Sequence, residues 1–318
     1  MNKNILIVVG ITILFLGTCI NPSVAIDNVK ESFLLLSNGN TLYVGGMGSG
    51  NYTRIQDAID NASDGDTVFV FDDSSPYKEH LQIGKSIVLV GEEKHSTIIE
   101  FYDSMVIHIM ASKVTVSNFT IQHSNKTGIS VYAEDNTLIT DIVIADNIIN
   151  NTHGVQVYKA TVNIQRNIIT NSSSDRGISL TSSIACIVHN IIIDCEVGID
   201  LTGQRETLVA YNDIRGASNV GIYIYHSSSG ISILNNNIQD NLYGIYSHFV
   251  QRILVKQNNF IKNSYHADFE NMWFTRWSRN YWDNWDGTGL YVVKGIQTWY
   301  RIPWFVFDWH PAKKPYDT

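Results

Sequence analysis

A short motif, Gly-apolar-x-apolar, recurs through the middle of the chain. Its successive glycines are spaced 26, 23, 21, 23 and 23 residues apart, at Gly128, Gly154, Gly177, Gly198, Gly221 and Gly244. A repeat with a period of roughly 20–50 residues is typical of a solenoid, in which each unit buries its apolar face against the next. This repeat limits the possible folds more than any other feature of the sequence.

A second motif, apolar-x-apolar-x-x-Asn-x-apolar, follows each glycine motif. Its asparagines are Asn147, Asn167, Asn190, Asn212, Asn236 and Asn258, with a last echo at Asn280. Both motifs alternate apolar and polar residues, are rich in β-branched residues and are separated by Asn, Ser and Gly. These properties predict two or three short strands in each unit, joined by tight turns, with no room for a helix between them.

Two solenoids fit this period. A leucine-rich repeat shares the Asn motif, but it needs an apolar residue eight positions before each Asn and no separate glycine strand. The chain has Lys159, Ser182, Gln204 and Ser228 at those positions. A parallel β-helix uses both strand motifs and adds a third strand near the Asn. We therefore predict an all-β, single-stranded parallel β-helix with about 22–23 residues per coil.

The repeat explains an unusual composition. The chain contains 30 Asn, as many as its Asp and Glu together. In a β-helix the coils stack about 4.8 Å apart, so each motif Asn lies over the next. Side-chain amides both donate and accept, and Asn tolerates a left-handed backbone, so we expect an Asn ladder at a corner. We expect the glycine column to mark another sharp bend, and we assign neither column to ligand binding.

Both ends of a solenoid need covers for unpaired strand edges. Apolar residues at helical spacing between Tyr52 and Ala62 predict a short N-terminal capping helix, with Asn51 or Thr53 as its N-cap. All 7 Trp lie between Trp273 and Trp309, so the C-terminal end is Trp-rich. We interpret it as a lid over the last coil, with a sugar-binding platform as the alternative. The expected division is 26–105 for the N-terminal cap and first strands, 106–283 for the repeats and 284–318 for the C-terminal cap.

Residues 1–25 resemble a secretory signal peptide, with Lys3, an apolar run from Ile5 to Ile20 and a Ser23-x-Ala25 site. An uncleaved membrane anchor is the alternative, and a lipoprotein signal through Cys19 is a weaker one. Two cysteines remain, Cys186 and Cys195, and we expect buried thiols. Six Asn-x-Ser/Thr sequons also fit a secreted or cell-surface protein: Asn51, Asn61, Asn118, Asn125, Asn150 and Asn171.

The charge of the chain excludes one class of partner. Only 16% of its residues are charged, against about 25% in an average domain, and the formal net charge is −8. An acidic protein does not offer a phosphate-binding surface, so we expect no nucleic-acid partner. We expect contact with a membrane only through an uncleaved N-terminal segment.

Three stretches together resemble a known family. They are Thr41-Leu-Tyr-Val-Gly-Gly with the Ile55-Gln-Asp-Ala-Ile segment, Lys85-Ser-Ile-Val-Leu-Val-Gly, and the Asn-x-Ile repeats. The chain resembles the NosD-type right-handed parallel β-helix proteins, which share the pectin lyase fold, and its ending resembles archaeal surface members. The resemblance implies a right-handed coil. Its implications for function are divided, because the founding member assists copper loading of nitrous oxide reductase and many relatives are secreted proteins of unclear role.

Strand alternation allows the outward residues of the glycine strands to be read directly. They place aromatic side chains on one sheet face, which predicts a glycan-binding surface at Tyr132, Tyr158, Tyr223, Tyr225, Tyr246 and His248. One carboxylate, Asp200, lies in these columns and is the candidate for catalysis, although we see no second acid in an adjacent coil and interpret it first as a solvated strand residue. His108 and Met110 form a compact pair of soft ligands, but two ligands are too few for copper.

These observations favour an exported, non-enzymatic β-helix that binds glycans or surface proteins, and they predict no cofactor and no metal site. Two alternatives remain open. One is a polysaccharide lyase or glycoside hydrolase that uses the outward face, and the other is an accessory protein for copper-enzyme maturation.

Overall fold

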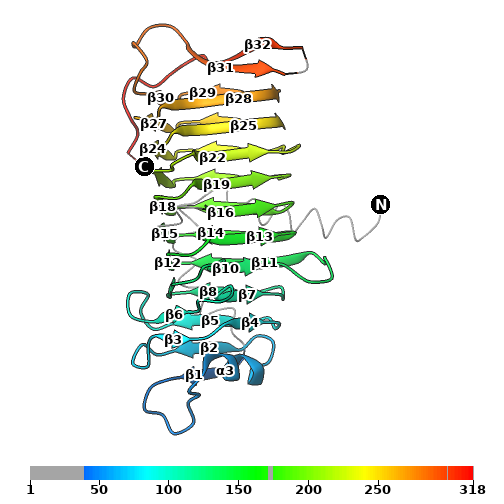
Figure 1. The fold of residues 1–318 in the computed structure, drawn as a ribbon, viewed down its shortest axis with the longest axis vertical. Coiled ribbons are helices and arrows are strands. Elements are labelled where there is room, and N and C mark those ends of the chain that lie inside the picture. Colours follow the sequence, from blue (N-terminus) through cyan, green and yellow to red (C-terminus); the bar gives the residue numbers. More distant parts are fainter. Residues whose placement is uncertain (1–38, 171–174, 299, 318) are drawn as a thin grey trace.

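The computed structural model describes residues 39–170, 175–298 and 300–317. The expected signal segment and the Asn171 sequon lie outside these residues. The described chain winds into a right-handed parallel β-helix whose coils stack from the helix α3 (Ile55–Asn61) to a hairpin of β31 and β32 (Figure 1). The β-helix that the repeats predict is therefore confirmed.

Each coil contributes one strand to each of three parallel sheets, which form the sides of the solenoid. The first, which we call the tyrosine sheet, contains β4 (Leu81–Ile83), β7 (Ile107–Ile109), β10 (Ile129–Val131), β13 (Val155–Tyr158), β16 (Arg176–Thr181), β19 (Val197–Thr202), β22 (Val220–Tyr225), β25 (Tyr243–Gln251), β28 (Tyr265–Trp273) and β31 (Tyr291–Gln297).

The chain then enters the second sheet. Its strands are β1 (Thr41–Val44), β2 (Thr67–Val70), β5 (Val88–Gly91), β8 (Thr115–Ser117), β11 (Ile139–Ala145), β14 (Ala160–Gln165), β17 (Ile184–Val188), β20 (Leu208–Ala210), β23 (Ser232–Leu234), β26 (Leu254–Lys256), β29 (Arg276–Ser278) and β32 (Ile302–Asp308). The antiparallel pairing of β31 with β32 joins the first two sheets at the C-terminal end.

The third sheet is built from the shortest strands. They are β3 (Tyr77–Lys78), β6 (Ile98–Glu100), β9 (Thr120–Gln122), β12 (Ile148–Asn150), β15 (Ile168–Thr170), β18 (Ile191–Ile193), β21 (Asp213–Arg215), β24 (Asn237–Gln239), β27 (Asn259–Ile261) and β30 (Tyr281–Trp282). Inward residues of all three sheets stack in columns to form one continuous core. In the tyrosine sheet, for example, Ile178, Ile199, Ile222 and Ile245 lie in register and are at most 1% exposed.

The Asn ladder forms at the corner between the second and third sheets. From Asn147 to Asn280, each Nδ2 donates to the Oδ1 of the next Asn at 2.9–3.1 Å. The same Oδ1 accepts the backbone N–H of the preceding ladder Asn at 2.9–3.1 Å. The ladder ends on Asp308, which is fully buried and accepts Asn280 Nδ2 at 2.9 Å. These amides therefore satisfy buried backbone groups as well as one another.

Two details of the corners differ from the sequence prediction. The left-handed residue is the one before each ladder Asn, as at Arg166 (φ 54°) and Tyr211 (φ 56°), rather than the Asn itself. The glycine column marks a bend only in part: Gly154 has a left-handed backbone (φ 64°) just before β13. The last four glycines of the column lie within strands, and close approach of the coils explains them better than a bend. A Cβ on Gly198 would lie 2.6 Å from the carbonyl oxygen of Gly221 in the next coil.

The N-terminal cap is the helix α3, which is seven residues long and buries Ile55, Ala58 and Ile59 on the first coils. Its predicted N-cap was wrong, because neither Asn51 nor Thr53 bonds to the helix. Instead the carboxylate of Glu79 accepts the backbone N–H groups of Ile55 and Gln56 at 2.9 and 3.1 Å, where the helix dipole favours a negative charge. Within the described ranges, no helix is both long and apolar enough to span a bilayer.

The Trp-rich C-terminal cap is only partly a lid. Trp277 and Trp282 are buried, and the Trp282 ring stacks on Phe260 and Tyr291 at 4.2 and 4.0 Å between ring centroids. These rings close the apolar end of the solenoid. By contrast, Trp273, Trp304 and Trp309 are 43%, 37% and 63% exposed, so they do not seal the core.

Candidate functional site

The outward face of the tyrosine sheet carries the residues that the repeats point to. Strand register aligns Asp200 with Tyr223 and Tyr223 with Tyr246, and it aligns Tyr225 with His248. The register continues one strand further, to Asp268 and Glu270 of β28. The two columns read from the sequence are thus real columns on one surface, because successive coils stack without a shift in register here.

Four of the predicted residues form one aromatic cluster on β22 and β25. The rings of Tyr223 and Tyr246 stack with centroids 5.8 Å apart, and those of Tyr225 and His248 stack at 5.2 Å. Tyr223 also stacks on Tyr225 at 5.8 Å. Each ring is therefore held by a neighbour along the strand or across it, which gives the face a rigid apolar surface with polar tips.

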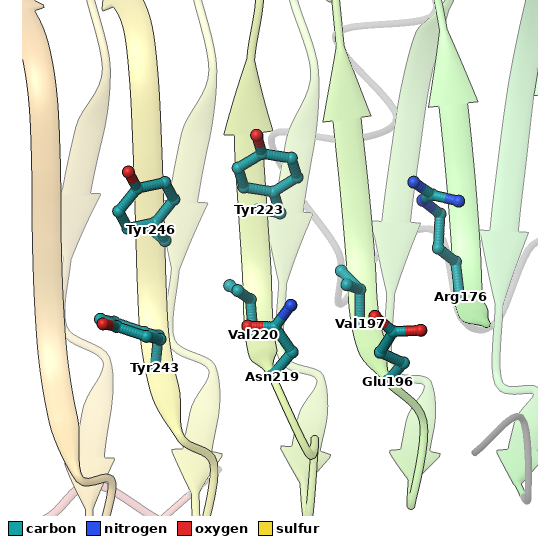
Figure 2. Close-up of a pocket in the computed structure, with 8 residues that line it drawn as sticks. All are labelled: Arg176, Glu196, Val197, Asn219, Val220, Tyr223, Tyr243 and Tyr246. Carbon is teal, nitrogen blue, oxygen red and sulfur yellow. The ribbon is translucent and has the colours of Figure 1, made fainter. Parts of the chain in front are cut away.

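A depression of about 350 Å³ adjoins this cluster. Figure 2 shows the rings of Tyr223 and Tyr246 side by side on neighbouring strands, with Tyr243 beside them and with Arg176 and Glu196 toward the N-terminal coils. The depression thus combines aromatic faces with a guanidinium, a carboxylate and the amide of Asn219. This is the composition of a site that binds a ligand with both apolar and hydroxyl-bearing faces.

Sequence reasoning missed Tyr243 and Tyr265, which stack on each other at 4.8 Å beside Tyr246. Alternation along β25 would turn Tyr243 inward with Ile245. Tyr243 is instead half-buried and lines the depression, because it lies at the strand start, where the chain leaves the corner. The available signal was an aromatic residue just before the Gly244 motif, at Tyr243, and at the matching position of the next coil, Tyr265, where His266 replaces the glycine.

Tyr132 and Tyr158 do not join the cluster. They line a separate, smaller hollow of about 160 Å³ together with Ser130, Gln156 and Ser179. Tyr132 packs against the His108 ring at 4.2 Å, and Tyr158 is 37% exposed. The six predicted ligand-binding residues therefore divide into a C-terminal cluster of four and an N-terminal pair.

Asp200 lies between the two groups and is not the solvated residue that we expected. It is only 4% exposed. Its Oδ2 accepts Arg176 Nε at 2.5 Å, and its Oδ1 accepts the Thr202 hydroxyl at 3.0 Å. A carboxylate with both oxygens held in this way positions Arg176 at the edge of the depression, and it has no free oxygen aimed at a ligand.

A second group of acids, absent from the sequence interpretation, borders the cluster on β28. Glu270 accepts the Tyr246 hydroxyl at 2.7 Å, and its other oxygen lies 3.4 Å from His248 Nε2. Burial and the Glu270 carboxylate raise the pKa of the Tyr246 phenol above its ordinary value, so the hydroxyl stays protonated and donates. Asp268 lies two residues away on the same face, where burial raises the pKa of its carboxyl.

The described residues do not fit a copper site. His108 is 4% exposed, its Nε2 lies 3.2 Å from the Tyr132 carbonyl oxygen, and burial lowers the pKa of its ring. Met110 is half-buried one position after the end of the same strand. Cys186 and Cys195 are buried. No three His, Cys, Asp or Glu side chains converge in the part of the chain that the structure describes.

The sequons occupy varied surroundings. Asn61 and Asn125 are exposed, whereas Asn51, Asn118 and Asn150 are half-buried. Asn61 Nδ2 donates to the Asp57 carbonyl at 2.8 Å at the end of α3. Glycosylation at these positions stays a prediction.

The fold resembles those of a mannuronan epimerase, an alginate lyase and a bacteriophage tailspike. The A-module of mannuronan C-5 epimerase AlgE4 from Azotobacter vinelandii is 14% identical, with a TM-score of 0.57 over 75% of this chain and 78% of that one. An alginate lyase from Paenibacillus sp. is 13% identical, with a TM-score of 0.56 over 75% of this chain and 95% of that one. Tailspike protein 2 of an Escherichia coli O157:H7 bacteriophage is 14% identical, with a TM-score of 0.51 over 80% of this chain and 39% of that one. At such low identity these similarities show the β-helix fold alone.

Sequence comparison adds the family. No curated protein sequence matches the chain. Residues 59–295, which include nearly all of the β-helix, match the family described as periplasmic copper-binding protein (NosD). The family is described as periplasmic, which places the chain with extracytoplasmic proteins. The chain belongs to the NosD family of right-handed parallel β-helix proteins.

Proposed function

We propose that the chain is an extracytoplasmic glycan-binding protein whose binding surface is the outward face of the tyrosine sheet. The observation that carries the proposal is the stacked cluster of Tyr223, Tyr225, Tyr246 and His248 beside the 350 Å³ depression. Sugar rings have apolar faces that stack on aromatic rings, and their hydroxyls bond to polar side chains at the edge. Arg176, Glu196 and Asn219 supply such polar groups here.

The charges around this face favour a neutral glycan over a polyuronate. Asp200 already pairs with Arg176, and Asp175 also lies close to Arg176, with 3.4 Å between Oδ1 and Nη1. Glu196 lines the depression, and Glu270 bonds to Tyr246 at its edge. Carboxylates therefore outnumber the single guanidinium, and a chain of uronic acids would be repelled.

The proposal is tested by measuring binding to a panel of neutral polysaccharides and to alginate and pectate. We expect a neutral glycan to bind, and we expect Tyr223→Ala with Tyr246→Ala to weaken it about tenfold or more. Tyr102→Ala is the matched control, because Tyr102 is 68% exposed and lies in the loop after β6, several coils before β22 and β25. Equal binding by the Tyr223/Tyr246 variant and the Tyr102 control, or no binding of the wild type to any glycan, would contradict the proposal.

A second candidate function is glycoside hydrolysis at Asp268 and Glu270. Two residues apart on one strand face, their Cα atoms are separated by roughly 6.6 Å, which is compatible with the carboxyl separation of roughly 5–9.5 Å that glycoside hydrolysis uses. Burial raises the pKa of Asp268, as suits a general acid, while Tyr246 and His248 orient Glu270.

Release of reducing ends from the bound glycan tests this second candidate. We expect Glu270→Gln and Asp268→Asn each to abolish turnover while binding persists. Asp200→Asn is the informative comparison, since Asp200 is held by Arg176 and Thr202 and has no oxygen to offer a substrate. Absence of product from every glycan that binds would leave the protein a binding protein and reject the enzyme.

A further inference from the structure

The hairpin of β31 and β32 lies at the C-terminal end of the solenoid (Figure 1). Its inner face carries the buried Val293 opposite Val306, which packs on the core. Register places the remaining side chains on the opposite face, which we call the hairpin outer face. Its members are Val292, Lys294 and Ile296 from β31 and Pro303, Phe305 and Phe307 from β32.

This face is apolar and open to solvent. Val292, Ile296 and Phe305 are 37%, 38% and 46% exposed. Trp309 extends it, since its ring lies 5.5 Å from that of Phe307 and it is 63% exposed. A contiguous group of exposed aromatic and branched aliphatic side chains is rare on a soluble protein unless another surface covers it.

The charges at this end differ from those of the rest of the chain. Residues 271–318 contain six Lys or Arg and four Asp or Glu, whereas the whole chain has 22 and 30. Within 291–309 the cations are Lys294 and Arg301, both exposed, and the acid is Asp308, which is fully buried at the end of the Asn ladder. The exposed surface of the hairpin is therefore positive on an otherwise acidic protein.

We propose that the hairpin outer face binds the surface of an anionic lipid bilayer, with its apolar side chains entering the headgroup region. Aromatic residues are favoured at this depth, and lysine and arginine extend their charges toward lipid phosphates. The position of Lys294 distinguishes a bilayer from a protein partner. It lies between Val292 and Ile296 in the middle of the face, where a protein interface would bury its charge but a headgroup layer neutralises it.

The hairpin outer face is separate from the cluster of Tyr223, Tyr225, Tyr246 and His248, although register places Ile296 beside Glu270 at the last strands of the tyrosine sheet. Membrane binding there goes beyond the proposed glycan site, and it revises the expectation that only the N-terminal segment meets a membrane. Because β31 and β32 lie at one end of the solenoid, docking there leaves the earlier strands of the tyrosine sheet, including β22 and β25, uncovered along the side (Figure 1). A protein held in this way would present its side to glycans next to the membrane.

The test uses the intrinsic fluorescence of the full chain. All 7 Trp lie between Trp273 and Trp309, so the apolar run near the N-terminus contributes no signal even if it contacts lipid. The probe is a vesicle of phosphatidylcholine and phosphatidylglycerol with brominated acyl chains, which quench Trp at the depth of the interface. We expect quenching with these vesicles, and weaker quenching at high salt or with phosphatidylcholine alone.

The decisive variant is Ile296→Ser with Phe305→Ser. Both side chains are exposed, so the fold should persist, which far-UV circular dichroism checks. We expect apparent partitioning to fall by about tenfold or more for each side chain removed. Tyr102→Ser with Leu138→Ser is the control, since these residues are 68% and 62% exposed elsewhere on the solenoid, and it should partition like the wild type.

Three outcomes would overturn the proposal. The first is a wild-type protein whose Trp fluorescence the brominated vesicles leave unchanged. The second is equal quenching in the Ile296/Phe305 variant. The third is self-association of the protein without vesicles, which depends on protein concentration and is abolished by the same variant, together with no quenching by vesicles. That result would assign the face to a second copy of the chain.

Discussion

Replacing Asn212 by Ala tests the Asn ladder at its middle. Asn212 makes bonds in three directions: Nδ2 donates to the carbonyls of Ile187 and Ala210 at 2.9 and 3.0 Å and to Asn236 Oδ1 at 2.9 Å. Its Oδ1 accepts the backbone N–H and the Nδ2 of Asn190 at 2.9 and 3.0 Å. The side chain is 1% exposed, so bulk water does not replace these bonds.

The expected cost follows from what the substitution leaves behind. The backbone N–H of Asn190 loses the acceptor described above and stays buried, which costs about 1–3 kcal/mol. The carbonyls of Ile187 and Ala210 each lose a donor, at about 1 kcal/mol for each bond. We therefore expect Asn212→Ala to lower the free energy of unfolding by about 3–5 kcal/mol, a large part of a typical stability of about 5–15 kcal/mol.

Urea unfolding followed by far-UV circular dichroism measures this loss. The matched control is Asn219→Ala, an exposed Asn one corner later in the same coil, which should change the stability by about 0.5 kcal/mol or less. Trp fluorescence reports the C-terminal end alone, because every Trp lies there. It therefore shows whether the coils beyond Asn212 unfold with the rest. A loss below about 1 kcal/mol, the worth of a single bond, would refute the ladder as the main polar support of the coils.

Three further perturbations have defined outcomes. Gly198→Ala brings a Cβ to 2.6 Å from a backbone carbonyl oxygen of the next coil, so we expect the midpoint of urea unfolding to fall sharply, and an unchanged midpoint would contradict the close approach. Asp308→Asn puts an NH₂ group where Asn280 and its neighbours donate, and it should cost about 1–3 kcal/mol. The transition followed by Trp fluorescence should then occur at a lower urea concentration than the transition followed by circular dichroism. Coincident transitions would argue against a local role for Asp308. Burial lowers the pKa of His266 below its usual 6.5, although Asp283 Oδ1, 2.8 Å from Nε2, opposes this shift. The unfolded chain therefore binds the proton more readily than the folded chain does. The free energy of unfolding should fall as the pH drops below about 6.5, by at most about 1.4 kcal/mol per pH unit for this group. Urea titrations at several pH values should show a shallower pH dependence for His266→Gln, and an unchanged slope would contradict the assignment.

The β-helix, its coil length and its ladder were predictable because each follows from a repeated local pattern. A column of Asn or Tyr in the sequence becomes a column in space whenever coils stack in register, and Tyr223 and Tyr246 show this directly. The sequence predictions were wrong where a contact comes from residues far apart in the chain and no local pattern determines it. The N-cap of α3 comes from Glu79, more than twenty residues away, and the sequence near the helix carries no sign of it.

The candidate site was only partly predictable for the same reason. Alternation placed four aromatic residues of the cluster correctly, but it turned Tyr243 to the wrong side, because the corner breaks the alternation. Glu270 was overlooked because β28 lacks the glycine that marks the earlier strands: His266 occupies the place that Gly244 holds in β25. The outward exposure of Trp304 and Trp309 depends on how the last hairpin folds back, which composition does not specify.

The measurement that tests the proposed function most directly is hydroxyl-radical footprinting of the chain with and without a glycan that it binds. We expect the bound glycan to protect Tyr223, Tyr225, Tyr243 and Tyr246 from oxidation, while Tyr102 and the exposed Trp309 react as in the free protein. Protection elsewhere with these tyrosines unchanged would contradict the assignment of the tyrosine sheet as the binding face.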